Sequence, residues 1–157
     1  MRNLLLVGLA LVELLVVPAA GSQQRTTPTA PGTRGDPTWQ RTIRLSDGRT
    51  FVTDGGFAID AALARPPALP SQVIDKPKAF EAYLDSPRKD EFGLRDLKPA
   101  GDSRTYTSPS GIVLNSTYIN FLRRVVPAAR LRMAGDYDPI QIVADGKTVG
   151  VLMPVKK

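Results

Sequence analysis

Three polar side chains, Asn120, Arg123 and Arg124, have types and a spacing that suit a chemical task. They lie in a segment, residues 116–126, whose apolar residues recur at helical spacing. At about 100° per residue, the three polar residues share one side of a helix and the apolar residues fill the other. Such a helix buries one face and offers a basic, hydrogen-bonding face to a partner. A solvated surface without a partner is the alternative interpretation.

Positive charge is concentrated in the last third of the chain. Residues 104–157 contain eight Lys or Arg and three Asp, whereas residues 39–103 contain ten basic and ten acidic residues. The last third therefore carries +5 of the net charge of +6. A positive field over part of a small domain favours anionic partners such as nucleic acid or lipid headgroups.

The residue types that most often perform catalysis are missing from this sequence. It has no histidine and no cysteine, which removes the commonest general base and any thiolate nucleophile or metal ligand. It also has no phosphate-binding glycine loop and no nucleophile elbow. Asp136, Asp138 and Asp145 do not follow the ligand spacing of a calcium loop, and turn formation explains them better. We therefore expect a non-catalytic protein with no metal ion and no cofactor.

The chain divides into three parts. Residues 1–21 combine Arg2, an apolar run at 4–17 and small residues, which is typical of a signal peptide. The run is short for a membrane span and contains the acidic Glu13, so an uncleaved anchor and a non-functional N-terminal extension are alternatives. Residues 22–38 are rich in Thr, Pro, Gly and Gln, which predicts a disordered linker. Residues 39–157 have the size of one domain.

The pattern of this last part predicts an α+β domain with antiparallel strands and two helices. A proline in the first turn and apolar residues on one face predict a helix at 77–85. Asn115 or Ser116 can cap a second helix at 116–126, which Pro127 ends. Residues 61–70 and 86–104 are predicted to be irregular connections. Strands are predicted at 42–45, 50–52, 57–59, 111–114, 129–133, 140–143 and 147–153.

Two blocks of the sequence resemble the bacterial sliding clamp, the beta subunit of the replicative DNA polymerase. Residues 51–58 (FVTDGGFA) resemble the family's Thr-Asp-Gly-His-Arg-Leu-Ala block. Residues 114–122 (LNSTYINFL), 138–140 (DPI) and 151–156 (VLMPVK) resemble a second block. In the family, this block has an Asn-x-x-Tyr-Leu helix start, a Pro-hydrophobic strand and a closing Met-Pro-Met-Arg, in that order and at similar spacing.

The resemblance implies a clamp-like α+β domain whose helices face duplex DNA and whose sheets lie outside. A clamp subunit has three such domains, whereas this chain has room for one, and residues 60–110 have no match. Asn120, Arg123 and Arg124 would then contact DNA phosphates without reading base sequence. The resemblance is also compatible with a homo-oligomer.

The resemblance also implies a pocket that grips short peptides from partner proteins. Carried over, it would involve Thr53, Gly55, Met153, Pro154 and Val155. The family has His and Arg where Gly56 and Phe57 stand here, and it brings the two blocks together from neighbouring domains. The pocket would therefore need oligomerisation or a changed arrangement. A tight turn at 53–56 and a proline-blunted strand end at 153–154 are the structural alternatives.

Two functions remain open at this point. One is a clamp-like module associated with DNA, which implies a cytoplasmic location. The other is an exported small α+β binding domain with no DNA role, which the signal-like N-terminus favours.

Overall fold

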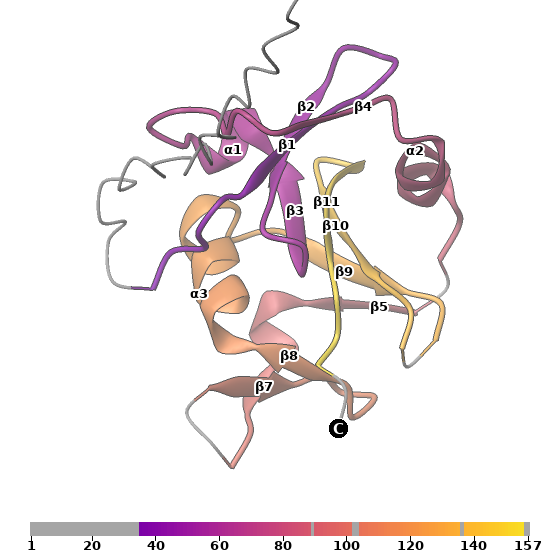
Figure 1. The fold of residues 1–157 in the computed structure, drawn as a ribbon. Helices are drawn as coiled ribbons and strands as arrows, with labels where there is room; N and C mark the ends of the chain where they lie inside the picture. The colour runs from indigo at the N-terminus through magenta and orange to yellow at the C-terminus, as the bar shows by residue number, and fades with distance from the viewer. Residues whose placement is uncertain (1–34, 89, 102–103, 136, 156–157) are drawn as a thin grey trace, which may run out of the picture.

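The computed structural model describes residues 35–88, 90–101, 104–135 and 137–155, so the signal-like segment 1–21 lies outside the described residues. Figure 1 shows the fold, which is α+β as predicted. The elements follow the chain in this order: β1 Arg41–Arg44, β2 Thr50–Thr53, β3 Phe57–Asp60, α1 Ala61–Ala64, β4 Val73–Asp75, α2 Lys78–Asp85, β5 Asp90–Gly93, the 3₁₀ turn η1 Leu94–Asp96, β6 Lys98–Pro99, β7 Thr105–Thr107, β8 Val113–Asn115, α3 Ser116–Val125, β9 Arg130–Met133, β10 Ile140–Ala144 and β11 Lys147–Leu152.

A large sheet and a small sheet organise these elements. The large sheet has eight strands in the order β4-β1-β2-β3-β11-β10-β9-β5, and the small one has the order β6-β7-β8. All pairings are antiparallel except that of β1 with β4. The last strand, β11, lies between β3 and β10, so its pairing with β3 joins the N-terminal strands to the C-terminal ones.

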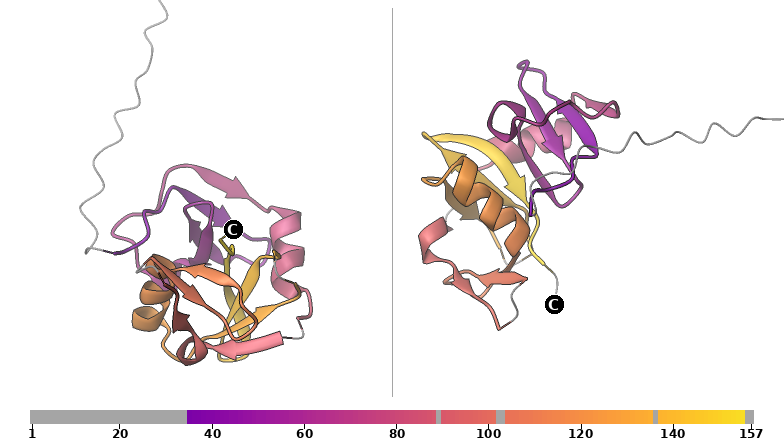
Figure 2. Two further views of the ribbon diagram at one scale, coloured as in Figure 1. Left: turned by 90° about the horizontal axis from the view of Figure 1, so that it is seen from below. Right: turned by 90° about the vertical axis from the view of Figure 1, so that its left-hand side faces the viewer.

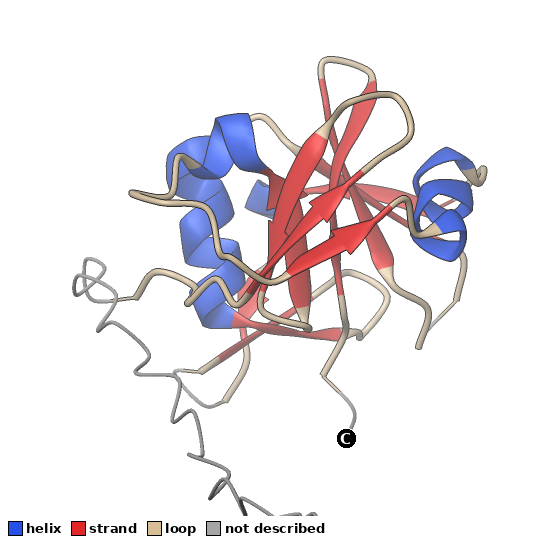
Figure 3. Ribbon diagram, turned by 45° about the horizontal axis from the view of Figure 1, so that its top comes forward, coloured by secondary structure: helices blue, strands red, loops and turns tan. Residues whose placement is uncertain are grey.

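The two faces of the large sheet bury different cores, because successive side chains of a strand point to opposite faces. Val52, Phe57, Ile59 and Leu152 lie in the larger core, which also contains the apolar side of α3. Phe51, Ala58 and Val151, their neighbours in sequence, lie in a smaller core beside α2. Figures 2 and 3 accordingly show α3 and α2 on opposite sides of the strands.

The helix predicted at 116–126 is confirmed as α3, and Asn115 is its cap. The Asn115 side-chain oxygen accepts a hydrogen bond from the backbone N–H of Thr117 at 2.8 Å, which satisfies a donor of the first turn. The helix ends at Val125, before Pro127. Ile119, Phe121 and Leu122 are buried, as the helical spacing predicts.

The helix predicted at 77–85 is also confirmed, as α2. Its last turn is held by a buried side chain from β10, which the sequence pattern did not reveal. The Gln141 side-chain amide donates hydrogen bonds to the carbonyl oxygens of Tyr83, Leu84 and Ser86, at 2.8, 3.2 and 2.7 Å. These carbonyls lie at the C-terminal end of the helix, where backbone carbonyl groups have no hydrogen-bond donor within the helix.

The segments predicted to be irregular contain more structure than expected. Residues 61–70 begin with the short helix α1, which Asp60 caps by accepting a hydrogen bond from the N–H of Ala62 at 2.8 Å. Residues 86–104 contain β5, η1 and β6, and two further short strands, β4 and β7, were not predicted. These strands have two to four residues, which is too few for a periodic pattern in the sequence.

The folded part begins earlier than residue 39, which corrects the predicted end of the linker. Pro37 is buried and the Asp36 carboxylate forms an ion pair with Arg124 of α3. The Trp39 ring packs against the rings of Phe57 and Phe121, with centroids 5.7 and 5.6 Å apart. The end of the predicted linker therefore lies against α3, while residues 22–34 lie outside the described residues.

Candidate functional site

The exposed face of α3 carries two of the three residues expected to contact DNA. Asn120 and Arg124 are exposed, on the side of the helix opposite Ile119 and Leu122, which are fully buried. Both side chains can therefore reach a partner without disturbing the core. We call Asn120 and Arg124 the α3 face.

Arg123 is used differently, because its guanidinium group turns toward the protein. It donates hydrogen bonds to the Tyr106 hydroxyl at 2.8 Å and to the Leu94 carbonyl at 2.9 Å, and it lies 4.5 Å from the centre of the Tyr106 ring. The Tyr106 hydroxyl in turn donates to the Asn120 side-chain oxygen at 3.2 Å. Arg123 thus fixes α3 to β7 and η1, and Tyr106 orients Asn120. The sequence placed Arg123 beside Arg124, and the structure separates their roles.

Arg124 meets the N-terminal segment rather than solvent alone. Its guanidinium group forms the ion pair with Asp36 and lies 5.7 Å from the centre of the Phe121 ring. About half of the Arg124 side chain is still exposed. Exposed ion pairs contribute roughly 0–1 kcal/mol. A stronger anion can therefore displace the Asp36 carboxylate at little cost in free energy.

The Thr-Asp-Gly turn that precedes β3 satisfies its own hydrogen bonds. The Thr53 hydroxyl accepts from the N–H of Gly55 at 3.0 Å, and the Asp54 carboxylate accepts from the N–H groups of Gly56 and Phe57 at 3.0 and 2.9 Å. Gly55 has a φ of +96°, which favours glycine. Thr53 is buried, so Gly55 is the more accessible of the two expected pocket residues in this turn. The side chains of Thr53 and Asp54 stabilise the turn.

Tyr118 of α3 packs over this turn. Its ring stacks on the Phe57 ring with centroids 5.0 Å apart. Burial, together with the hydrogen bond and negative charge of Asp54, raises the pKa of Tyr118 to about 12. A Cβ at Gly56 would lie 3.0 Å from the Tyr118 hydroxyl, so a larger residue there would need the hydroxyl to move by a few tenths of an ångström.

The terminal segment lies beside the same turn. The N–H of Met153 donates to the Gly56 carbonyl at 2.8 Å, and the N–H of Val155 donates to the Val113 carbonyl at 2.9 Å. Met153 and Val155 are 40% and 39% exposed, and Pro154 is half-buried. We call residues 153–155 the terminal patch. The two blocks that the resemblance links therefore meet within a single chain, and their contact needs no second copy.

The acidic residues considered for metal binding are turn residues where the structure describes them. Asp145 has a φ of +50° in the turn between β10 and β11, and the Asp138 N–H donates to the Gly135 carbonyl at 3.3 Å. Asp136 lies outside the described residues. Among the residues that the structure describes, no group of three or more acidic side chains is arranged to hold a metal ion.

No model of a known protein family, no curated protein and no solved structure matches this chain. Within the described ranges, no helix has the length and apolar character needed to cross a membrane.

The contact between Tyr118 and Asp54 predicts how stability depends on pH. A tyrosine pKa raised from 10.0 to about 12 in the folded protein stabilises the fold below pH 10, and this contribution is lost as the pH rises toward 12. We expect the free energy of unfolding to fall more steeply between pH 10 and 12 in the wild type than in Tyr118→Phe. Chemical denaturation at a series of pH values measures both slopes.

The matched control is Tyr137→Phe, because Tyr137 is 69% exposed. It should keep the wild-type slope. Equal slopes in the wild type and Tyr118→Phe would contradict the assignment of the raised pKa to Tyr118.

Proposed function

We propose that this chain is a non-catalytic, sliding-clamp-like module that associates with duplex DNA through the α3 face and with short peptides through the terminal patch. The α3 face is the observation that most supports DNA binding. It presents an exposed arginine and an amide oriented by Tyr106, with no acidic residue anywhere in the helix. The net charge of +5 over residues 104–157 supports the same partner.

The expected binding is weak and independent of base sequence. An arginine and an amide on one helix face can contact phosphate oxygens, which are the same at every base pair. Each phosphate that a cation neutralises releases counterions, so affinity falls as salt concentration rises. Because Asp36 pairs with Arg124, DNA must displace this carboxylate before Arg124 can bind a phosphate. The N-terminal segment therefore lowers the affinity of this face.

Replacing Arg124 tests this part of the proposal. In Arg124→Gln, the slope of log affinity against log salt concentration should fall by about one phosphate contact. In Asp36→Asn, affinity at low salt should rise up to about fivefold, because an exposed ion pair contributes at most about 1 kcal/mol. Fluorescence anisotropy of a labelled duplex, titrated with the whole chain at several salt concentrations, measures both effects.

Lys78→Gln is the matched control, since it removes one exposed positive charge from α2, on the opposite side of the large sheet. It should leave the affinity close to that of the wild type. Arg123 is unsuitable for this test because it fixes α3 to β7 and η1. A salt slope unchanged in Arg124→Gln would exclude the α3 face. An absence of duplex binding at low salt would favour the exported binding domain instead.

The peptide part of the proposal is favoured by a separate observation. The Met153 N–H bonds to Gly56, so the exposed side chains of Met153 and Val155 lie next to the Thr-Asp-Gly turn. The backbone N–H groups of Met153 and Val155 are already paired. A peptide would therefore bind through contact with apolar side chains rather than by adding a strand through these two donors.

A selection from a library of short peptides tests the terminal patch. Peptides selected on the wild type should lose about tenfold or more in affinity for Met153→Glu, because the new carboxylate would be desolvated on binding. Tyr137→Glu places the same charge at another exposed apolar residue and should bind the selected peptides normally. Isothermal titration calorimetry compares the variants. Equal affinity for Met153→Glu would place the peptide site elsewhere.

A further inference from the structure

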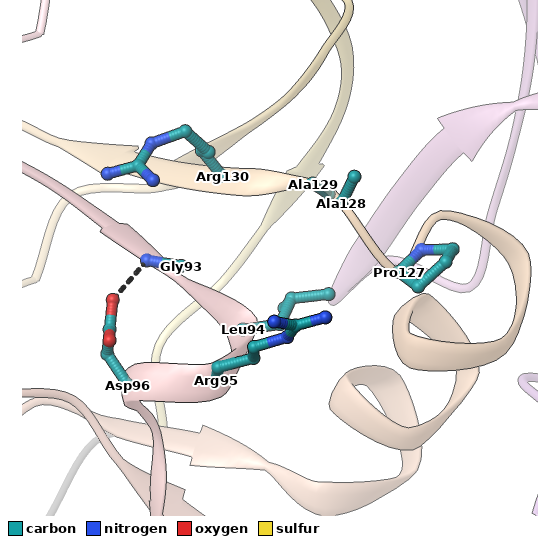
Figure 4. A pocket seen from close by; sticks show the side chains of 8 residues that line it. All are labelled: Gly93, Leu94, Arg95, Asp96, Pro127, Ala128, Ala129 and Arg130. Atoms are coloured by element: carbon teal, nitrogen blue, oxygen red, sulfur yellow. Dashed lines mark hydrogen bonds between the residues drawn. The ribbon is translucent and has the colours of Figure 1, made fainter.

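A pocket outside both proposed surfaces lies between η1 and the connection from α3 to β9. Figure 4 shows the side chains that line it. Its volume is about 460 Å³, within the range of small-molecule sites. The lining residues come from two segments that are far apart in the chain: Gly93, Leu94, Arg95, Asp96, Pro127, Ala128, Ala129 and Arg130.

Hydrogen bonds fix both walls of this pocket. Gly93 of β5 pairs with Arg130 of β9, which joins the two segments at one end. The Arg123 guanidinium holds the Leu94 carbonyl at 2.9 Å, which ties η1 to the last turn of α3. The N–H of Ala129 donates to the Val126 carbonyl at 2.9 Å and shapes the other wall. None of these bonds uses the Arg95 side chain, so the pocket is formed whether or not Arg95 binds a ligand.

The floor of the pocket is apolar and its polar groups are mainly cationic. Leu94 and Ala129 are each only 2% exposed. Among the described residues, no hydrogen bond or ion pair engages the Arg95 guanidinium. Figure 4 shows the Arg95 side chain extending over Leu94 toward Pro127. The Asp96 carboxylate accepts a hydrogen bond from the N–H of Gly93 at 2.7 Å but keeps its negative charge, which one of the arginines at the pocket must offset.

The second arginine adds to the positive charge at the opening. Arg130 forms an ion pair with Glu91, but the same carboxylate also pairs with Arg132. Two guanidinium groups thus share one carboxylate, which leaves one positive charge in excess. The C-terminal end of α3 has a negative helix dipole, which opposes an anion. Arg123 in the last turn of α3 offsets this dipole, whereas Arg124 is paired with Asp36.

We propose that this pocket binds a phosphate ester, with Arg95 contacting the phosphate and the exposed apolar side chains of Pro127 and Ala128 supporting the attached sugar. A guanidinium group binds phosphate oxygens through two parallel hydrogen bonds. A sugar has apolar carbon–hydrogen faces that can cover the exposed side chains of Pro127 and Ala128, and the volume is sufficient for more than a lone phosphate. The phosphate ester comes either from a DNA backbone, which rests on the proposed function, or from a free sugar phosphate.

Nuclear magnetic resonance of the ¹⁵N-labelled whole chain tests the pocket directly. Ribose 5-phosphate at low salt should shift the amide signals of Gly93, Leu94, Arg95 and Ala129, whereas ribose or sodium chloride should not. The shifts should disappear in Arg95→Gln and persist in Arg44→Gln, which removes an exposed arginine from β1. Absent shifts, shifts retained in Arg95→Gln, or equal shifts with ribose would overturn the proposal.

Duplex binding then distinguishes the two sources of the ester. If the pocket holds a backbone phosphate, Arg95→Gln should weaken duplex affinity by up to about fivefold and lower the salt slope by about one. Ribose 5-phosphate shifts without any change in duplex affinity would assign the pocket to a free sugar phosphate. If the wild type binds no duplex, the proposed DNA function is wrong. The ribose 5-phosphate result then still decides whether the pocket binds a phosphate ester.

Discussion

The fold depends on how Phe57 is buried. Its ring is 1% exposed and contacts three other rings: Trp39 at the start of the folded part, and Tyr118 and Phe121 of α3. Its strand, β3, pairs with β2 on one side and β11 on the other. Phe57 therefore lies where the N-terminal strands, α3 and the last strand meet. An arginine at position 57 would place a charge among these rings, with no partner in the contacts described.

Both proposed surfaces are positioned by this arrangement. Packing of Ile119, Phe121 and Leu122 against the sheet leaves Asn120 and Arg124 on the outer side of α3. The pairing of β11 with β3 carries the chain directly to the Thr-Asp-Gly turn, where Met153 bonds to Gly56. The packing around Phe57 thus positions both the α3 face, which is basic and polar, and the terminal patch, which is apolar.

Elements whose signals are local could be predicted from the sequence. The 3.6-residue spacing and a cap at Asn115 or Ser116 predicted the bounds of α3 to within one residue. The Asp-Gly turns predicted the strands β1 to β3. The short strands β4 to β7 could not be found, because two to four residues are too few for a periodic pattern. The inward turn of Arg123 depends on Tyr106, 17 residues earlier. Arg95 lies in the segment predicted to be irregular, so only the fold brings it beside Pro127.

The central claim is that the β3–β11 pairing and the rings around Phe57 make the described residues one cooperative unit. Equilibrium denaturation followed by two probes tests it most directly. Fluorescence of Trp39, the only tryptophan, reports on the contact of its ring with Phe57 and Phe121, and far-ultraviolet circular dichroism reports on the helices and strands throughout. We predict that the two transitions coincide, with one midpoint and one slope. Two separate transitions would show that the N-terminal and C-terminal halves unfold independently and would contradict this account.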